Sequence, residues 1–183
     1  VLVSGDISWA MKFDDALPDL QAISDLPGKK VLIRGNHDYW WQTLSKMNKV
    51  IGNKLTFLHN SFTSAGSYAV CGSRGWLCPG DRSFTANDIP IYERELLRIK
   101  TSLAAAKASG WERLILLLHY PPVNDKYEPS GFTELFAEYN VELCLFGHLH
   151  SDAAAGAPTG NWNGTVCHLV ACDALDFKLK QIV

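Results

Sequence analysis

The sequence predicts an α/β fold, in which short apolar strands alternate with helices. Apolar runs recur along the chain and are separated by polar segments long enough to hold helices. The run "LILLLH" is continuously apolar, as is typical of a strand covered on both faces. Residues 88–110 carry apolar side chains at spacings of four and three, which indicates an amphipathic helix. This alternation is typical of an α/β domain.

The expected strands, in chain order, are residues 1–4, 30–34, 68–72, 113–119, 141–146, 165–171 and the alternating run 176–183. The expected helices are 15–26, 41–48, 88–110 and 131–139. In the helix at 88–110, Asn87 or Asp88 can cap the start and Gly110 can close the end. The Gly- and Pro-rich segments 72–90 and 153–164 are expected to be long loops.

The composition indicates one globular domain over residues 1–183 and excludes several classes of protein. The formal net charge of −2 disfavours a nucleic-acid binder that relies on general positive charge, although it leaves room for a small phosphate site. No apolar run reaches the roughly 18 to 20 residues that span a membrane. The five cysteines form no CxxC pair, which favours buried thiols in the cytoplasm over a disulfide framework.

Four of the apolar runs end in side chains that can bind a metal ion or a phosphate group. The runs "VLVS", "KVLIR", "LILLL" and "VELCLF" are followed by GD, GNHD, HYPP and GHLH. The side chains in question are Asp6, Asn36, His37, His119, His148 and His150. Ligands of open α/β sheets bind outside the carboxyl ends of the strands, because the loops there converge. We therefore expect these side chains to meet.

Each of these residues also has a simpler explanation when it is taken alone. Asp6 can cap a turn, Asn36 can form a turn after a glycine, and His119 can be a core histidine bonded to a carbonyl. The hypothesis of a site depends on the agreement among four strand ends. His148 and His150 straddle Leu149 and point the same way on an extended segment, which suits two ligands of one metal cluster.

The types of donor narrow the choice of metal. Imidazoles, a carboxylate and a carboxamide, with no thiolate, suit divalent Mn, Fe, Zn, Co or Ni. An asparagine oxygen is unusual in structural zinc sites, where Cys and His dominate.

The ordered set GD, GNHD, a lone histidine after an apolar strand, and GHLH resembles the calcineurin-like metallophosphoesterases from Asp6 to His150. The resemblance implies two packed mixed β-sheets flanked by helices, with the strands after GHLH in the second sheet. It also implies a binuclear-metal phosphoesterase or phosphatase that acts on a phosphorylated substrate, with manganese among the possible metals. Phosphomonoesters and phosphodiesters both stay open as substrates, because loops set that choice.

The family pattern implies a role for each matching residue. Asp6 bridges two divalent metal ions, and a hydroxide between them attacks phosphorus. Asn36, His119 and His148 complete one metal site, and His150 binds the other ion. His37 is implied to sit beside the leaving group and to donate a proton or stabilise charge. Asp38 is implied to support its neighbours rather than to bind metal.

The sequence also departs from the family pattern. The pattern begins with an Asp-x-His strand before GD, and this chain has no such motif. We therefore expect an N-terminally incomplete domain, whose natural protein carries that strand before Val1. In the chain as given, we expect one metal to be held well and a second poorly. Trp9 and Ala10 replace the Asp and Arg of the serine/threonine phosphatase motif GDxxDRG, which favours a bacterial-type small phosphoesterase.

The substrate side of the site is less specific. Arg74 and Arg82 lie in a long loop and suit phosphate oxygens, with solvated loop charges as the alternative. Trp40 follows His37 closely and can stack on an organic leaving group, with packing beneath its loop as the alternative. Two other functions stay open: a non-catalytic scaffold domain that keeps the fold, and, with less support, a nuclease.

Overall fold

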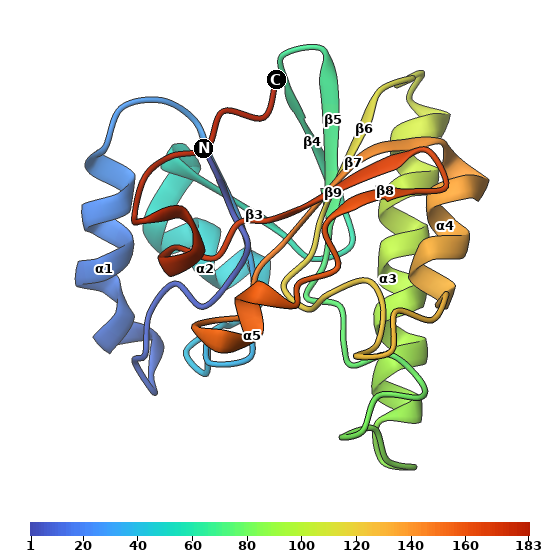
Figure 1. Ribbon diagram of the computed structural model, residues 1–183. Helices are drawn as coiled ribbons and strands as arrows, with labels where there is room; N and C mark the ends of the chain where they lie inside the picture. The colour runs from blue at the N-terminus through green and yellow to red at the C-terminus, as the bar shows by residue number, and fades with distance from the viewer.

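The computed structural model describes residues 1–183 and contains two β-sheets whose strands mostly run parallel (Figure 1). The smaller sheet has the order β1-β2-β3 and is parallel throughout. Its strands are β1 (Leu2–Val3), β2 (Lys30–Ile33) and β3 (Leu55–Leu58). Helices α1 (Phe13–Asp25) and α2 (Leu44–Ile51) lie beside it, at the left of Figure 1.

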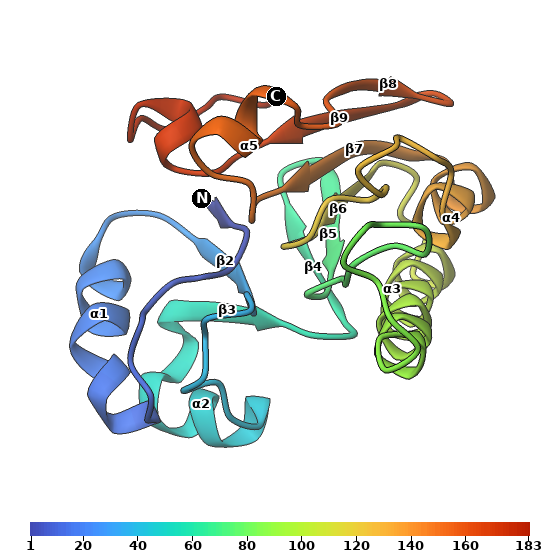
Figure 2. The ribbon, with the colours of Figure 1, turned by 60° about the horizontal axis from the view of Figure 1, so that its bottom comes forward.

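The larger sheet has the order β4-β5-β6-β7-β9-β8 and is mixed. Its strands are β4 (Phe62–Ala65), β5 (Tyr68–Gly72), β6 (Leu114–Leu117), β7 (Val141–Phe146), β8 (Gly160–Trp162) and β9 (Thr165–Leu169). The four inner strands are parallel, and β4 and β8 pair antiparallel at the two edges. Helices α3 (Ile89–Ala108) and α4 (Gly131–Tyr139) cover this sheet on the side away from α1 and α2 (Figure 2). A short helix α5 (Asp152–Ala155) follows β7, and the 3₁₀ turns are η1 (Gly52–Lys54) and η2 (Asp173–Leu175).

The apolar core has three parts. Alternate side chains of β6 lie in two of them, which explains why the sequence of this strand is apolar throughout. Leu116 is fully buried in the cluster that α3 and α4 form with the larger sheet. Its neighbour Leu117 is fully buried in a second cluster, where it meets Ile33 of the smaller sheet. A third cluster joins α1 and α2 to the smaller sheet and includes Trp40. Both faces of β6 are therefore covered, as the run "LILLLH" predicted.

The fold class predicted from the sequence is confirmed, because the chain forms two sheets flanked by helices. Strands β5 and β7 and helix α4 have the predicted bounds, and the other predicted helices shift by a few residues. Three strands were missed: β3, β4 and β8. The first two are only four residues long and the third is three, too short for a clear alternation.

The strand predicted at 176–183 is wrong, because the structure has no strand after β9. Phe177 and Leu179 are 82% and 83% exposed, so the alternating side chains of this segment have no apolar face to cover. The second edge of β9 is already paired with β8, which removes that partner. The loop predicted at 153–164 correspondingly contains most of α5 and all of β8.

The predictions about membrane-spanning segments and about cysteines can be compared with the structure. None of the helices is both long enough and apolar enough to cross a membrane. All five cysteines are free; four are buried and Cys172 is exposed.

Candidate metal centre

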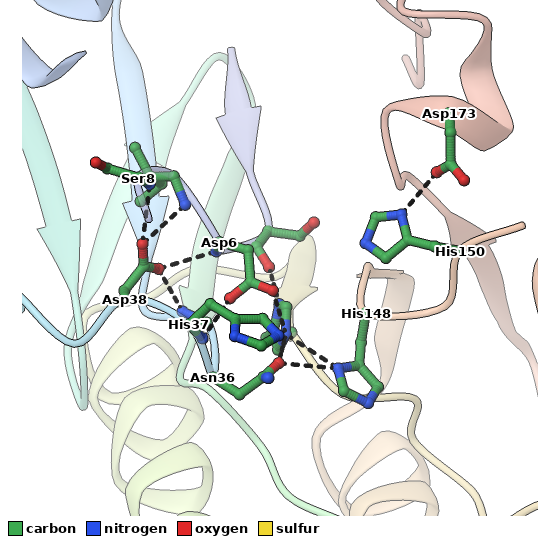
Figure 3. Close-up of polar contacts among 12 residues, drawn as sticks. Asp6, Ser8, Asn36, His37, Asp38, His148, His150 and Asp173 are labelled. Carbon is green, nitrogen blue, oxygen red and sulfur yellow. Dashed lines mark hydrogen bonds and ion pairs between the residues drawn. The ribbon is translucent and has the colours of Figure 1, made fainter. Parts of the chain in front are cut away.

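The polar side chains that follow four strands gather where the two sheets meet. The strands β1 and β2 are parallel neighbours in one sheet, and β6 and β7 are parallel neighbours in the other. Their carboxyl ends therefore open onto shared loops. The two sheets are joined at this point, because the Nδ1 atom of His119 lies 2.8 Å from the carbonyl oxygen of Ser4. Figure 3 shows the resulting cluster.

The buried carboxylate of Asp38 holds the loop after β1 against the loop after β2. It accepts hydrogen bonds from the backbone N–H groups of Asp6 (2.9 Å), Ile7 (2.8 Å), Ser8 (3.2 Å) and Gly35 (2.7 Å) and from the indole of Trp40 (3.0 Å). Burial raises the pKa of the Asp38 carboxyl, and the backbone hydrogen bonds oppose that rise. Asp38 thus organises the site and has no exposed surface.

The constraint from Asp38 places Asp6 in a strained backbone conformation. Asp6 has a φ of 53°, in the left-handed region that non-glycine residues seldom adopt. One oxygen of its carboxylate accepts a hydrogen bond from the backbone N–H of His37 at 2.8 Å. Gly35 makes this approach possible, because a Cβ atom there would overlap the carboxylate of Asp6. The two motifs therefore touch through backbone groups.

Four candidate metal ligands converge on one point. The Oδ1 atom of Asn36 lies 2.6 Å from Nε2 of His119 and 3.0 Å from Nδ1 of His148. Those two ring nitrogens are 3.2 Å apart, and Oδ2 of Asp6 lies 3.5 Å from Nε2 of His119. His148 has a φ of 69°, so a second candidate ligand occupies the strained left-handed region.

Electrostatics favour the neutral form of both converging imidazoles. Burial is the largest cause that lowers the pKa of His119. Burial, with the neighbouring ring of His119, lowers the pKa of His148 to about 4. The ring of Tyr120 packs against both, with centroids 4.2 Å from His148 and 5.3 Å from His119. Near pH 7 both rings are therefore neutral.

The protonation of the side chains around Asn36 suits a bound cation. The neutral ring of His119 donates from Nδ1 to Ser4, so its Nε2 carries a lone pair and no proton. That lone pair faces the amide oxygen of Asn36 and the carboxylate of Asp6, which are also acceptors. Converging acceptors of nitrogen and oxygen suit a divalent transition metal. No group of three or more Asp, Glu, His or Cys side chains is placed to hold a metal ion by itself. The donors meet instead at the side-chain oxygen of Asn36.

His150 lies apart from this convergence. Its Nδ1 atom is 2.8 Å from Oδ1 of Asp173, while Oδ2 of Asp173 accepts the backbone N–H of Ser151 at 2.9 Å (Figure 3). The Ser151 amide and the His150 ring hold the pKa of the Asp173 carboxyl down to about 2.

The partly buried ring of His37 lies between two exposed aromatic rings. Trp9 stacks on it with ring centroids 4.5 Å apart and an angle of 12° between planes. Tyr39 meets the same ring edge-on, with centroids 6.2 Å apart. Both aromatic side chains are largely exposed, so the imidazole of His37 remains close to solvent.

The three residues suggested for substrate binding lie elsewhere or are covered. Trp40 has no exposed surface, and its indole donates to Asp38, so the packing alternative describes it. The Arg74 side chain is mostly buried, with its guanidinium 3.9 Å from Glu95 and 4.3 Å from the Trp76 ring centroid. The Arg82 side chain is 86% exposed and lies 3.8 Å from Asp125, which is the solvated-charge alternative.

Sequence reasoning missed Asp173 and the stacking role of Trp9. Asp173 follows the end of β9 by four residues, so the strand-end criterion used for the other motifs also applied to it. Trp9 carried no signal beyond its departure from the phosphatase motif. Its contact with His37 depends on the turn that Asp38 imposes on the chain after Asp6.

Comparisons with known proteins agree with the family and the fold that the sequence predicts. A family model described as "Calcineurin-like phosphoesterase" matches residues 1–152. The crystal structure of TT1561 from Thermus thermophilus is similar to this chain, with a TM-score of 0.60 and 16% sequence identity. The similarity covers 90% of this chain and 72% of that one, and at such identity it shows the fold alone. No curated protein matches the chain.

Replacing Asp38 by Asn is expected to destabilise the protein by about 2 kcal/mol or more, because an amide cannot accept every hydrogen bond of the carboxylate and leaves buried N–H groups unpaired. Urea denaturation of the metal-free protein measures this. As a control, Asp14→Asn, in the exposed first turn of α1, is expected to cost less than about 1 kcal/mol. Equal effects of the two substitutions would contradict the role given to Asp38.

The lowered pKa of His148 predicts a pH dependence of stability in the metal-free protein. Between pH 6.5 and about 4 the unfolded chain binds a proton on this ring and the folded chain does not. The free energy of unfolding should therefore fall as the pH is lowered through this window. His148→Gln should make the decline shallower, as urea titrations at several pH values would measure. Parallel curves for the two proteins would refute the assignment.

Proposed function

This chain belongs to the calcineurin-like phosphoesterase family, and on that premise we propose that it is a metal-dependent hydrolase that cleaves phosphoester bonds. The observation that supports the proposal most is the convergence of Asn36, His119 and His148 beside Asp6. These donors come from both sheets, and the Nε2 lone pair of His119 faces the oxygens of Asn36 and Asp6. His37 lies next to this point and is free to contact a substrate.

We assign the metal donors as follows. Asp6, Asn36, His119 and His148 hold one divalent ion, and Asp6 and His150 contribute to a second. The donor set favours manganese, iron, zinc, cobalt or nickel. Bound divalent ions at such a centre neutralise phosphoryl charge and supply hydroxide near neutral pH.

The protein's own groups position the reacting parts. The backbone N–H of His37 fixes one oxygen of Asp6, which keeps that carboxylate oriented toward His119. The imidazole of His37 is held by stacking on Trp9 and not by a side-chain hydrogen bond, so both ring nitrogens are available to a phosphoryl oxygen or a leaving group. We assign His37 to stabilise the leaving group by donating a proton to it.

The substrate is a phosphorylated compound, either a monoester or a diester. The exposed rings of Trp9 and Tyr39 form the rim of the site beside His37, where the group leaving phosphorus would emerge. Arg74 is engaged by Glu95 and Trp76, so phosphate binding in this proposal rests on the metal centre and on His37.

The test is hydrolysis of an aryl phosphate monoester and the matching diester after removal of metal with a chelator and addition of Mn²⁺. Turnover of at least one substrate is expected only with metal. His37→Gln should lower kcat by about 10²- to 10⁴-fold and leave Mn²⁺ binding unchanged, because the ring acts on the leaving group.

His168→Gln is the matched control, because the ring of this histidine contacts Lys180 and none of the assigned metal donors, and its kcat should equal that of the wild type. Stoichiometric Mn²⁺ binding without turnover of either ester would refute the enzyme and favour a scaffold domain. Equal loss of metal and rate in His37→Gln would refute the role of His37.

A further inference from the structure

We propose that Asp173 is a positioning residue that fixes the His150 ring so that its Nε2 atom is free to bind a metal ion. This inference rests on the proposed function only in taking His150 as a metal ligand. The family match ends at residue 152, so Asp173 lies outside the segment that it describes.

Both oxygens of the Asp173 carboxylate are engaged. Oδ1 lies 2.8 Å from Nδ1 of His150, and Oδ2 accepts the backbone N–H of Ser151 at 2.9 Å. Asp173 therefore binds the side chain of His150 and the backbone of Ser151. Such a two-point contact restrains the rotation of the ring as well as its position.

The pairing of two strands brings Asp173 to this place. Strand β9 lies beside β7 in parallel register, with Phe146 opposite Leu169. The segments that follow the two strands therefore leave the sheet at the same end. One of them carries His150 and the other carries Asp173 in η2. A contact between residues far apart in sequence is thus set by the sheet.

The backbone around His150 requires support. Ser151 has a φ of 52°, in the left-handed region. Its N–H is held by Asp173, much as the N–H of Asp6, at a φ of 53°, is held by Asp38. Asp6 and His150, the two candidate ligands of the second ion, are thus each supported by an aspartate that accepts a hydrogen bond from a strained backbone segment.

The Asp173 carboxylate also selects the tautomer of His150. An ionised carboxylate can only accept a hydrogen bond, so Nδ1 of His150 must carry the proton that they share. In the neutral ring, Nε2 then holds the lone pair. In Figure 3 this second ring nitrogen points to the side on which Asp6 lies. A carboxylate partner also makes an imidazole a stronger metal ligand, and removing such partners typically weakens metal binding by about 10- to 100-fold.

A purely structural ion pair is the alternative explanation. The side chains of His150 and Asp173 are 49% and 31% exposed, and exposed pairs contribute little to stability. The two explanations differ in what they predict for metal binding and for the tautomer.

The test compares Asp173→Asn with the wild type in metal-stripped protein titrated with Mn²⁺. The amide has the shape of the carboxylate, but facing Nδ1 of His150 it can donate, which moves the ring proton to Nε2. Mn²⁺ affinity at the weaker site should fall by about 10-fold or more. Asp176→Asn, an exposed substitution at the end of the same 3₁₀ turn, should leave it unchanged.

Two further measurements separate positioning from general damage. In a His150→Gln background, Asp173→Asn should have no additional effect on Mn²⁺ affinity. Imidazole ¹⁵N NMR of the metal-free wild type should show His150 protonated at Nδ1, with the proton on Nε2 in Asp173→Asn. An unchanged tautomer, an additive loss in the double variant, or no Mn²⁺ binding by the wild type would overturn the proposal. Failure to hydrolyse any phosphoester would refute the proposed function and leave these three results interpretable.

Discussion

The Asp38 carboxylate joins the loop after β1 to the loop after β2, and the position of Asp6 depends on it. Three consecutive backbone N–H groups, from Asp6 to Ser8, point at this one side chain. A loop that turns its amides inward in this way cannot be stable without an acceptor, because buried N–H groups that lack a partner are costly. The carboxylate thus stabilises the left-handed conformation of Asp6 and turns its side chain toward the other sheet.

The contact between the two sheets completes the arrangement. Ser4, directly after β1, accepts a hydrogen bond from Nδ1 of His119, which follows β6. This hydrogen bond sets the tautomer of His119 and directs the lone pair of its Nε2 at Asn36. His150 and Asp173 repeat this arrangement: an oxygen accepts the hydrogen bond of one ring nitrogen, and the other ring nitrogen keeps its lone pair. The fold therefore controls which ring nitrogen can bind a metal ion through Ser4 and Asp173, which are not themselves assigned as metal ligands.

Much of this could be predicted from the sequence, and the failures have physical causes. Parallel strands bring their carboxyl ends together, so polar residues after β1, β2, β6 and β7 indicated a site without knowledge of the strand order. Contacts that depend on loop conformation could not be predicted in this way. Trp40 and Arg74 sit in loops whose turns bury them, while Trp9 is exposed and stacks on His37. The tail at 176–183 alternates like a strand, yet no free edge of β9 is left to pair with it.

The central claim is that the donors meeting at Asn36 form a metal site. Crystals grown with Mn²⁺, measured at the manganese absorption edge, test it most directly. We predict an anomalous peak bonded to Oδ1 of Asn36, Nε2 of His119 and Nδ1 of His148, with Asp6 as a further ligand. Well-ordered crystals with no peak at this point, or with manganese bound only elsewhere on the protein, would contradict it.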